Sequence, residues 1–336
     1  MSPMNQYTQK IAIVRLSALG DIVNSSIVLQ FINSKYPEAQ IDWITEEAFA
    51  PLLKHHPSLH AVHTINLKKL KKEKSLKLFF MIVKKLRSLN KYDLVIDMQG
   101  LLKSAIVSRI LGSNVHGFDK NSIREPIASL FYNSSSNISY QTNVVKRNFF
   151  LVADSLKIEI NNEMILNKKP IFEITKKFNF SHGKKNIAFV IGASWPSKIY
   201  PKEFIAKICD ELKEECHIIW GSDDERLNAE WICTNSEFAS LAPKLELDEL
   251  ASFISGMDLL IGNDTGPTHL AWAQNIPSIT LLGPTTTRMI QETSKNIGIK
   301  SSSKVNLLKI NKNDFSIKDI PSERVLTKAK ELLYGL

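Results

Sequence analysis

One segment in the last third of the chain shows its architecture most clearly: Asp258-Leu-Leu-Ile-Gly-Asn-Asp-Thr-Gly-Pro-Thr-His-Leu-Ala-Trp-Ala-Gln-Asn-Ile-Pro-Ser-Ile-Thr-Leu-Leu-Gly-Pro-Thr-Thr-Thr287. Two short apolar runs, residues 259–261 and 279–282, are typical of parallel strands buried on both faces. Between them, Pro267 suits a first helical turn, and residues 270–273 form an apolar helix face. The segment therefore predicts a strand, a turn, a crossover helix and a second parallel strand.

The turn before this helix has the composition of an anion site. Free backbone amides, the hydroxyls of Thr265 and Thr268 and the imidazole of His269 gather where the helix begins, at Gly266. A helix N-terminus, with its positive dipole end, suits a phosphate or diphosphate. The alternative is an ordinary crossover turn in which Asp264 and Thr265 cap the helix and His269 is a core residue. The local sequence fits both interpretations equally well.

Length and composition indicate a two-domain globular protein. The chain has 336 residues, enough for two sizeable cores, with 43% hydrophobic and 23% charged residues. Its three cysteines lack any Cys-x-x-Cys pairing, so neither a disulfide framework nor a zinc site is indicated, and a reducing cytoplasm is the expected location. Since no signal-like core and no apolar run of membrane-spanning length occur, we expect a soluble or at most peripheral protein.

Positive charge is concentrated in the first half. Residues 1–167 carry 21 Lys and Arg against 13 Asp and Glu, so this half is expected to meet something anionic. Much of the excess lies in residues 67–87. There, helical spacing of Phe79, Ile82, Val83 and Leu86 predicts a basic amphipathic helix with a lysine-rich approach. Any single lysine fits an ordinary solvated face, but the patch as a whole favours an acidic ligand or an anionic membrane surface.

Strands and helices alternate in both halves, which predicts an open parallel sheet in each. The polar, lysine-rich residues 161–185 between the halves are expected to be the linker region. Predicted strands cover residues 11–15, 41–44, 62–65 and 94–96 in the first half and residues 187–191, 217–220, 238–241, 259–261 and 279–282 in the second.

Polar residues follow several of these strands, at the sheet edge where open α/β sheets bind ligands. After the first strand, Asp21 is either a ligand-facing acid or the cap of the next helix, and the later Asp97 reads as a structural acid. In the second half, the turn 192–198 supplies amides, hydroxyls and an ammonium. The acidic start of residues 223–225 offers carboxylates to a ribose diol, or is simply an acidic helix start.

Several chemistries lack their defining residues. The chain has no Gly-x-Gly-x-x-Gly, no P-loop and no His-Glu-x-x-His, which argues against a dinucleotide dehydrogenase, a P-loop nucleotidase and a zinc protease. It also has no Asp-x-Asp pair to hold a metal on a sugar-nucleotide diphosphate. A transferase would therefore have to offset the diphosphate charge with Lys198 and the helix end at Gly266.

Five segments resemble glycosyltransferase family 9, the lipopolysaccharide heptosyltransferases. The Asp-Thr-Gly-x-x-His element is typical of the whole family, whereas the Arg-Glu-Pro and Asp-Trp segments point to its type I members. The resemblance covers nearly the whole chain. Its segments are Ser17-Ala-Leu-Gly-Asp21, Ile41-Asp-Trp-Ile-Thr-Glu-Glu-Ala-Phe49, Ile96-Asp-Met-Gln-Gly-Leu-Leu-Lys-Ser-Ala105, Arg124-Glu-Pro-Ile-Ala-Ser-Leu-Phe-Tyr-Asn133 and Asn263-Asp-Thr-Gly-Pro-Thr-His-Leu270.

The resemblance implies an α/β protein with the GT-B fold, in which two Rossmann-like domains face each other across a central cleft. Residues 1–167 would bind the acceptor, residues 168–320 would bind the nucleotide-sugar donor, and a C-terminal helix, 321–336, would pack back onto the first domain. The implied reaction moves L-glycero-D-manno-heptose from ADP-heptose to Kdo of Kdo-lipid A, with inversion and with no metal or cofactor. The implied location is peripheral, on the cytoplasmic face of the inner membrane.

The resemblance also implies residue roles. Asp21 would be the catalytic base, and Asp223 would hold the ribose. Only the backbone amide of Ala193 could serve the phosphate, where a second hydroxyl residue is typical of the family. Implied donor contacts are Ala193, Ser194, Lys198, Asp223, Leu245, Asp264, Thr265, Gly266, Thr268 and His269, and implied acceptor contacts are Ser17, Gly20, Lys68, Lys103 and Arg124.

Three other functions stay open at this point. A type II or III heptosyltransferase would share the donor turn and differ in acceptor, and a non-catalytic nucleotide-sugar sensor would not need Asp21. A nucleic-acid-binding protein would explain the charge, but Phe79 and Phe80 are expected on the apolar side of the basic helix, away from any base. No nucleic-acid partner is therefore expected.

Overall fold

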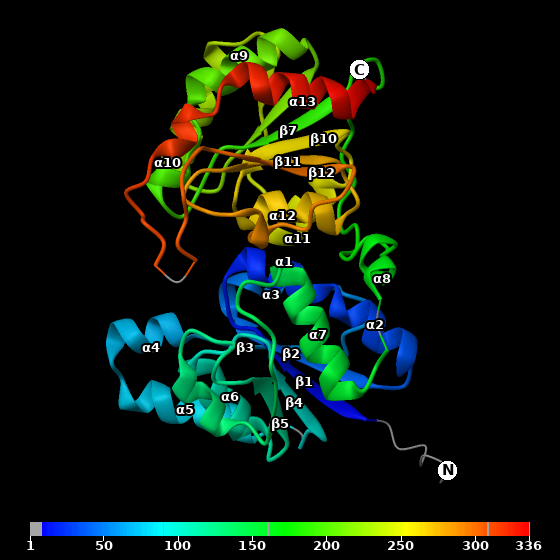
Figure 1. The fold of residues 1–336 in the computed structure, drawn as a ribbon, viewed down its shortest axis with the longest axis vertical. Coiled ribbons are helices and arrows are strands. Elements are labelled where there is room, and N and C mark those ends of the chain that lie inside the picture. Colours follow the sequence, from blue (N-terminus) through cyan, green and yellow to red (C-terminus); the bar gives the residue numbers. More distant parts are fainter. Residues whose placement is uncertain (1–8, 90, 160, 308, 336) are drawn as a thin grey trace. The chain divides into compact units, whose positions relative to one another are not determined.

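The structure is a computed structural model that describes residues 9–89, 91–159, 161–307 and 309–335. These residues form two compact units (Figure 1). The first contains the chain up to Thr142 together with Lys146–Lys168, and the second contains Asn143–Val145 and the chain from Lys169 onward. Among the described residues, no helix combines the length and the apolar character needed to cross a bilayer.

Each unit is built on a six-stranded parallel sheet. The order in the first is β3-β2-β1-β4-β5-β6, and in the second it is β12-β11-β10-β7-β8-β9. Both sheets wind outward in two directions from their first strand, which is the Rossmann order expected from the alternating pattern. The strands are β1 (Lys10–Val14), β2 (Gln40–Glu46), β3 (Ala61–Ile65), β4 (Leu94–Asp97), β5 (Val115–Phe118), β6 (Ser134–Ser136), β7 (Asn186–Val190), β8 (Glu215–Ile219), β9 (Ala239–Leu241), β10 (Leu259–Asn263), β11 (Ser278–Leu282) and β12 (Asn296–Lys300).

Helices connect the strands in both units and cover the sheets. Apolar residues of the central strands and the helix faces form a core cluster in each unit. The α-helices are α1 (Leu19–Ser26), α2 (Val28–Lys35), α3 (Ala50–Leu53), α4 (Leu67–Glu73), α5 (Leu76–Arg87), α6 (Leu102–Leu111), α7 (Val144–Leu156), α8 (Asn162–Leu166), α9 (Lys202–Leu212), α10 (Asp223–Thr234), α11 (Leu247–Ile254), α12 (Gly266–Ala273) and α13 (Ser322–Tyr334).

Strands β5, β6 and β12 were not predicted, because they lack the apolar run that marks a buried strand. β6 is three serines, and its partner β5 carries His116 at a buried position. The imidazole lies 2.8 Å from the hydroxyl oxygens of both Ser134 and Ser136. A polar network thus replaces apolar packing at this sheet edge, and hydrophobic periodicity cannot reveal it.

The C-terminal helix packs differently from the expectation. Helix α13 lies against α9, and Val325 and Ala329 belong to the core of the second unit. Glu323 also forms an ion pair with Lys207 of α9. The expectation that residues 321–336 return to the first domain is therefore wrong, because the apolar face of α13 is buried against its own unit.

The basic segment 67–87 contains the predicted amphipathic helix as α5, and its lysine-rich approach forms a second helix, α4. The two helices are separated at Lys74, whose φ of 49° is left-handed. Only Ile82 and Leu86 of α5 are buried, whereas Phe79 and Phe80 are exposed. The expectation that both phenylalanines face the core is wrong, since α5 meets the core through one narrow stripe.

A buried acid network joins β2 to β3 in the first unit. The Asp42 carboxylate lies 2.9 Å from ring nitrogens of His60 and His63 and accepts a 2.7 Å hydrogen bond from the Tyr92 hydroxyl. Burial raises the pKa of Asp42, but these hydrogen bonds outweigh it and lower the pKa to about 2. The folded state therefore holds an ionised carboxylate over a wider pH range than the unfolded chain does.

This network predicts an acid-sensitive first unit. Since the folded pKa of Asp42 is depressed, its stabilising contribution is present above about pH 4 and is lost as the pH falls towards 2. Thermal unfolding between these pH values should show a steeper loss of Tm for the wild type than for Asp42→Asn. Parallel curves for the two proteins would contradict the assignment.

Candidate active site

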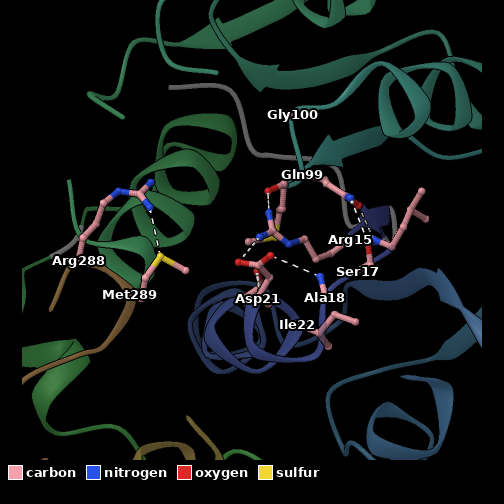
Figure 2. A network of polar contacts seen from close by, with 12 residues as sticks. Arg15, Ser17, Ala18, Asp21, Ile22, Gln99, Gly100, Arg288 and Met289 are labelled. Carbon is pink, nitrogen blue, oxygen red and sulfur yellow. Dashed lines mark hydrogen bonds and ion pairs between the residues drawn. The ribbon is translucent and has the colours of Figure 1, made fainter. Parts of the chain in front are cut away.

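Asp21 lies at the carboxyl end of the first unit's sheet. It is the third residue of α1, its side chain is 31% exposed, and its carboxylate lies 2.9 Å from the Arg15 guanidinium (Figure 2). The same carboxylate accepts the Ala18 backbone N–H at 3.3 Å. Arg15 is buried and also donates to the Met98 carbonyl. Asp21 therefore caps its helix and still presents a carboxylate to solvent, so the two interpretations of this residue are compatible.

Ser17 and Lys103, two of the expected acceptor residues, meet beside Asp21. The Ser17 hydroxyl lies 3.4 Å from the Lys103 ammonium and 3.4 Å from the Gln99 side-chain amide. Gln99 in turn accepts the Leu16 backbone N–H at 2.8 Å, and Gly20 lies in the first turn of α1. Neither Arg15 nor Gln99 was predicted as a site residue, although both lie at or just after the ends of predicted strands.

Asp97 is structural, as the sequence indicated. Its fully buried carboxylate accepts hydrogen bonds from the Ser104 hydroxyl at 2.9 Å, the Tyr132 hydroxyl at 2.8 Å and the Gln99 backbone N–H at 2.9 Å. Burial raises the pKa of Asp97 in spite of these donors. Asp97 thus organises the turn that carries Gln99, and it offers no free base.

The residue after Arg124 holds the Arg124 loop at the same edge of the sheet. Arg124 is exposed, and the adjacent Glu125 carboxylate accepts the Leu102 backbone N–H at 2.7 Å, at the start of α6 and one residue before Lys103. The loop that carries Arg124 is therefore held at the helix end that carries Lys103.

Lys68 is linked to Lys103 by a buried acid that was not predicted. Glu46 ends β2, is buried, and accepts hydrogen bonds from the backbone of Leu67 and Lys68 in the first turn of α4. Burial raises the pKa of Glu46, while the ammonium groups of Lys103 and Lys68 act in the opposite direction. The acceptor residues expected in the first unit are thus brought together at one edge of its sheet.

In the second unit, Asp264 is the centre of a buried charged cluster. Its carboxylate lies 3.0 Å from the Lys198 ammonium and 3.2 Å from the His269 imidazole. Burial raises the pKa of Asp264, but the Lys198 ammonium and the His269 imidazole outweigh it and hold the pKa well below its usual range. Asp264 is therefore an ionised partner of Lys198, and His269 is a buried member of the cluster.

Asn263 joins the two donor turns expected from the sequence. Its side-chain amide donates to the carbonyls of Ile191 at 2.9 Å and Gly192 at 3.2 Å. Its own carbonyl accepts the hydroxyls of Thr268 at 2.6 Å and Thr265 at 3.4 Å. The turns after β7 and β10 are thus one structure at the point where strand order reverses, which is where such sheets bind ligands.

The remaining phosphate candidates lie on the same two turns. Ala193 is half-buried and Ser194 exposed in the turn after β7, and Gly266 opens α12 directly after Thr265. The amides at the start of α12 lie beside the Lys198 ammonium, which is paired with Asp264. An anion bound here would share Lys198 with that carboxylate.

The acidic start of α10 places Glu225, rather than Asp223, at the strand ends. The Glu225 carboxylate accepts the Gly221 backbone N–H at 2.7 Å, and a Cβ added at Gly192 would lie 2.1 Å from its Oε1 atom. Asp223 is exposed at the first position of the helix. The geometry therefore places Glu225, one of the three acids at this helix start, beside the donor turns.

Leu245 is half-buried in the segment after β9. Trp220 connects this segment to the end of β8, since its indole N–H donates to the Ala242 carbonyl at 2.8 Å. The described residues contain no group of three or more His, Cys, Asp or Glu side chains that could hold a metal ion.

Two Rossmann-like units, with a phosphate-suited turn in one and an accessible carboxylate at the sheet edge of the other, define an α/β protein of the GT-B fold class. The model of one family, described as "Glycosyltransferase family 9 (heptosyltransferase)", matches residues 79–318. The chain belongs to glycosyltransferase family 9.

Individual relatives extend this match over the whole chain. Lipopolysaccharide heptosyltransferase 1 of Campylobacter coli is 39% identical, covering 96% of this chain and 98% of that protein. The protein of the same name from Pseudomonas aeruginosa is 30% identical, covering 82% and 79%. Among solved structures, E. coli heptosyltransferase WaaC with ADP superposes with a TM-score of 0.80 at 24% identity, covering 96% and 100%.

Proposed function

We propose that this chain transfers L-glycero-D-manno-heptose from ADP-heptose to Kdo of Kdo-lipid A, with inversion at the anomeric carbon, as the first heptose of the lipopolysaccharide inner core. The observation that carries the proposal is the 39% identity to lipopolysaccharide heptosyltransferase 1 of Campylobacter coli over 96% of the chain. It includes the first unit, where the acceptor would bind, as well as the second.

In this proposal the second unit binds ADP-heptose. The diphosphate lies on the backbone amides of Ala193, Gly266 and Thr268 and on the hydroxyls of Ser194 and Thr265, and Lys198 neutralises it with the helix end. Adenine lies beside the backbone of Leu245, and Asp264 and His269 face the heptose. Because these groups supply the positive charge, the proposal requires neither a metal nor another cofactor.

The ribose contact gives a first test of the donor site. If Glu225 accepts hydrogen bonds from the ribose hydroxyls, Glu225→Gln should weaken ADP binding about 10- to 100-fold, the value of a hydrogen bond to a charged group. Asp223→Asn, the matched control on the same helix turn, should change it little. Calorimetry with ADP and with 2′,3′-dideoxy-ADP separates the roles, since wild type and Asp223→Asn should discriminate strongly between them and Glu225→Gln should not. A larger loss of ADP affinity in Asp223→Asn than in Glu225→Gln would show that Asp223 holds the ribose.

The first unit supplies the acceptor site in this proposal. Ser17 and Gly20 shape the edge beside Asp21, while Lys68, Lys103 and Arg124 meet the carboxylates and phosphates of the acceptor. Arg124 and Lys68 are exposed, whereas Lys198 is largely buried. Raising the ionic strength from about 0.05 M to about 0.5 M should therefore raise the acceptor KM much more than the donor KM, because exposed charges are screened most. Equal increases would contradict this assignment.

The acceptor is lipid-linked, so we place the enzyme peripherally at the cytoplasmic face of the inner membrane, with no nucleic-acid partner. The decisive experiment offers ADP-heptose with either Kdo-lipid A or an acceptor that already carries one heptose. Transfer to Kdo-lipid A alone supports the proposal. Preference for the heptosylated acceptor would instead identify a type II or III activity, and donor binding without any transfer would identify a nucleotide-sugar sensor.

A further inference from the structure

Helices α4 and α5 carry an exposed surface that is both apolar and basic, and that is coloured cyan at the left of the first unit in Figure 1. We call it the α4–α5 surface. Leu76 is 74% and Phe80 64% exposed, with Phe79 and Met81 exposed beside them. Residues 67–87 contain nine Lys and Arg against one Glu. Large apolar side chains are thus held in solvent within the most basic part of the chain.

Apolar and basic residues share one outward face of α5. Leu76, Phe80, Lys84 and Arg87 follow one another at spacings of four, four and three residues, so they lie along one line of the helix. The apolar pair occupies the first turns and the cations the last. The rings of Phe79 and Phe80 contact each other edge to face, with centroids 5.6 Å apart and planes at 71°. The result is a compact apolar tip followed by cations.

We propose that the α4–α5 surface docks the first unit on an anionic lipid bilayer, with Leu76 and Phe80 inserted at the level of the acyl chains and the surrounding lysines at the headgroups. Apolar side chains gain free energy on leaving water, and long lysine side chains can keep their charge at the interface while their stems lie in an apolar environment. Each cation near an anionic surface adds attraction. The surface therefore has both the apolar and the cationic side chains that binding to an anionic bilayer requires.

The surface is continuous with the proposed acceptor site. Lys68 belongs to the first turn of α4, whose backbone is bound by Glu46, and Lys103 acts on the same carboxylate. Docking through α4 and α5 therefore keeps the acceptor residues of this unit next to the lipid headgroups. This inference rests on the proposed function, since a lipid-linked acceptor is what makes such a position useful.

The side chains fit a bilayer better than a nucleic acid. Leu76 and Met81 are aliphatic and offer no ring face to a base, and the rings of Phe79 and Phe80 pack against each other rather than lying parallel as a stacking platform. A nucleic acid would contact the lysines but leave Leu76, the most exposed apolar residue of this surface, without a partner.

Vesicle partition of the full chain tests the proposal. Wild type is compared with L76S/F80S and with a matched control, L166S/I174S, whose residues are 54% and 58% exposed elsewhere in the chain. On phosphatidylglycerol-containing vesicles, L76S/F80S should bind about 100-fold less, about tenfold for each inserted side chain, and the control about as well as wild type. Wild-type binding should also weaken on pure phosphatidylcholine and at high salt.

Two outcomes would overturn the docking. In the first, L76S/F80S partitions onto vesicles as well as wild type does. In the second, L76S/F80S loses binding to a single-stranded oligonucleotide but still binds vesicles. Transfer to an acceptor without acyl chains should be the same in wild type and L76S/F80S, whereas transfer to a vesicle-borne acceptor should fall. Because partition is measured without donor or acceptor, a chain that docks but transfers no heptose would overturn the proposed function alone.

Discussion

Asp21→Asn is expected to lower kcat by a factor on the order of 10²–10⁴ while leaving ADP-heptose affinity nearly unchanged. Inverting transfer needs the acceptor hydroxyl to lose its proton as it attacks the anomeric carbon opposite the departing ADP, and a positioned carboxylate can accept that proton. Asn keeps the shape of the side chain and one acceptor oxygen, enough for either the Arg15 contact or the Ala18 hydrogen bond, but it removes the basicity. Steady-state kinetics with direct ADP binding checks both parts.

The structure provides a control with the same chemical change in the same unit. Asp93 lies just before β4 and accepts the Lys10 backbone N–H at 2.8 Å, at the amino end of the strands. Asp93→Asn should therefore keep a near-normal kcat. If Asp21→Asn also kept a near-normal kcat, the proton would have to go elsewhere. A loss of donor affinity in Asp21→Asn would instead make Asp21 a purely structural cap.

Lys198→Met is expected to weaken ADP and ADP-heptose binding alike, by about 10- to 100-fold, because it removes the cation that the diphosphate would share with Asp264. It should also destabilise the second unit by about 3–5 kcal/mol, since a buried carboxylate loses its ammonium partner. Calorimetric ADP binding and thermal unfolding measure the two effects separately.

A second variant distinguishes ligand binding from structure at this cluster. In Lys198→Met/Asp264→Asn the uncompensated charge is gone, so most of the lost stability should return while ADP binding stays weak. Recovery of ADP binding together with stability would show that Lys198 acts only through Asp264. In wild type, EDTA should have little effect on turnover, and abolition of activity by EDTA with restoration by magnesium would contradict the metal-free proposal.

Much of this protein was readable from local sequence. The apolar runs at 259–261 and 279–282 identified β10 and β11, because a strand buried on both faces must be continuously apolar. Asp21 and the turn 262–266 were placed at strand ends by the same alternation. These features depend on residues close together in the chain, so local patterning determines them.

Tertiary structure alone decided how the site residues pair. Lys198 and Asp264 are 66 positions apart, and nothing local indicates that the expected phosphate-binding ammonium is held by a buried carboxylate. Glu225 lies beside the donor turns because the backbone near Gly192 approaches it across neighbouring strands. Whether an apolar residue is covered likewise depends on which element packs there. Val325 is buried by its own unit, while Phe80 on α5 contacts the ring of the neighbouring Phe79 and remains exposed. Such contacts join segments distant in sequence, so only the folded chain determines them.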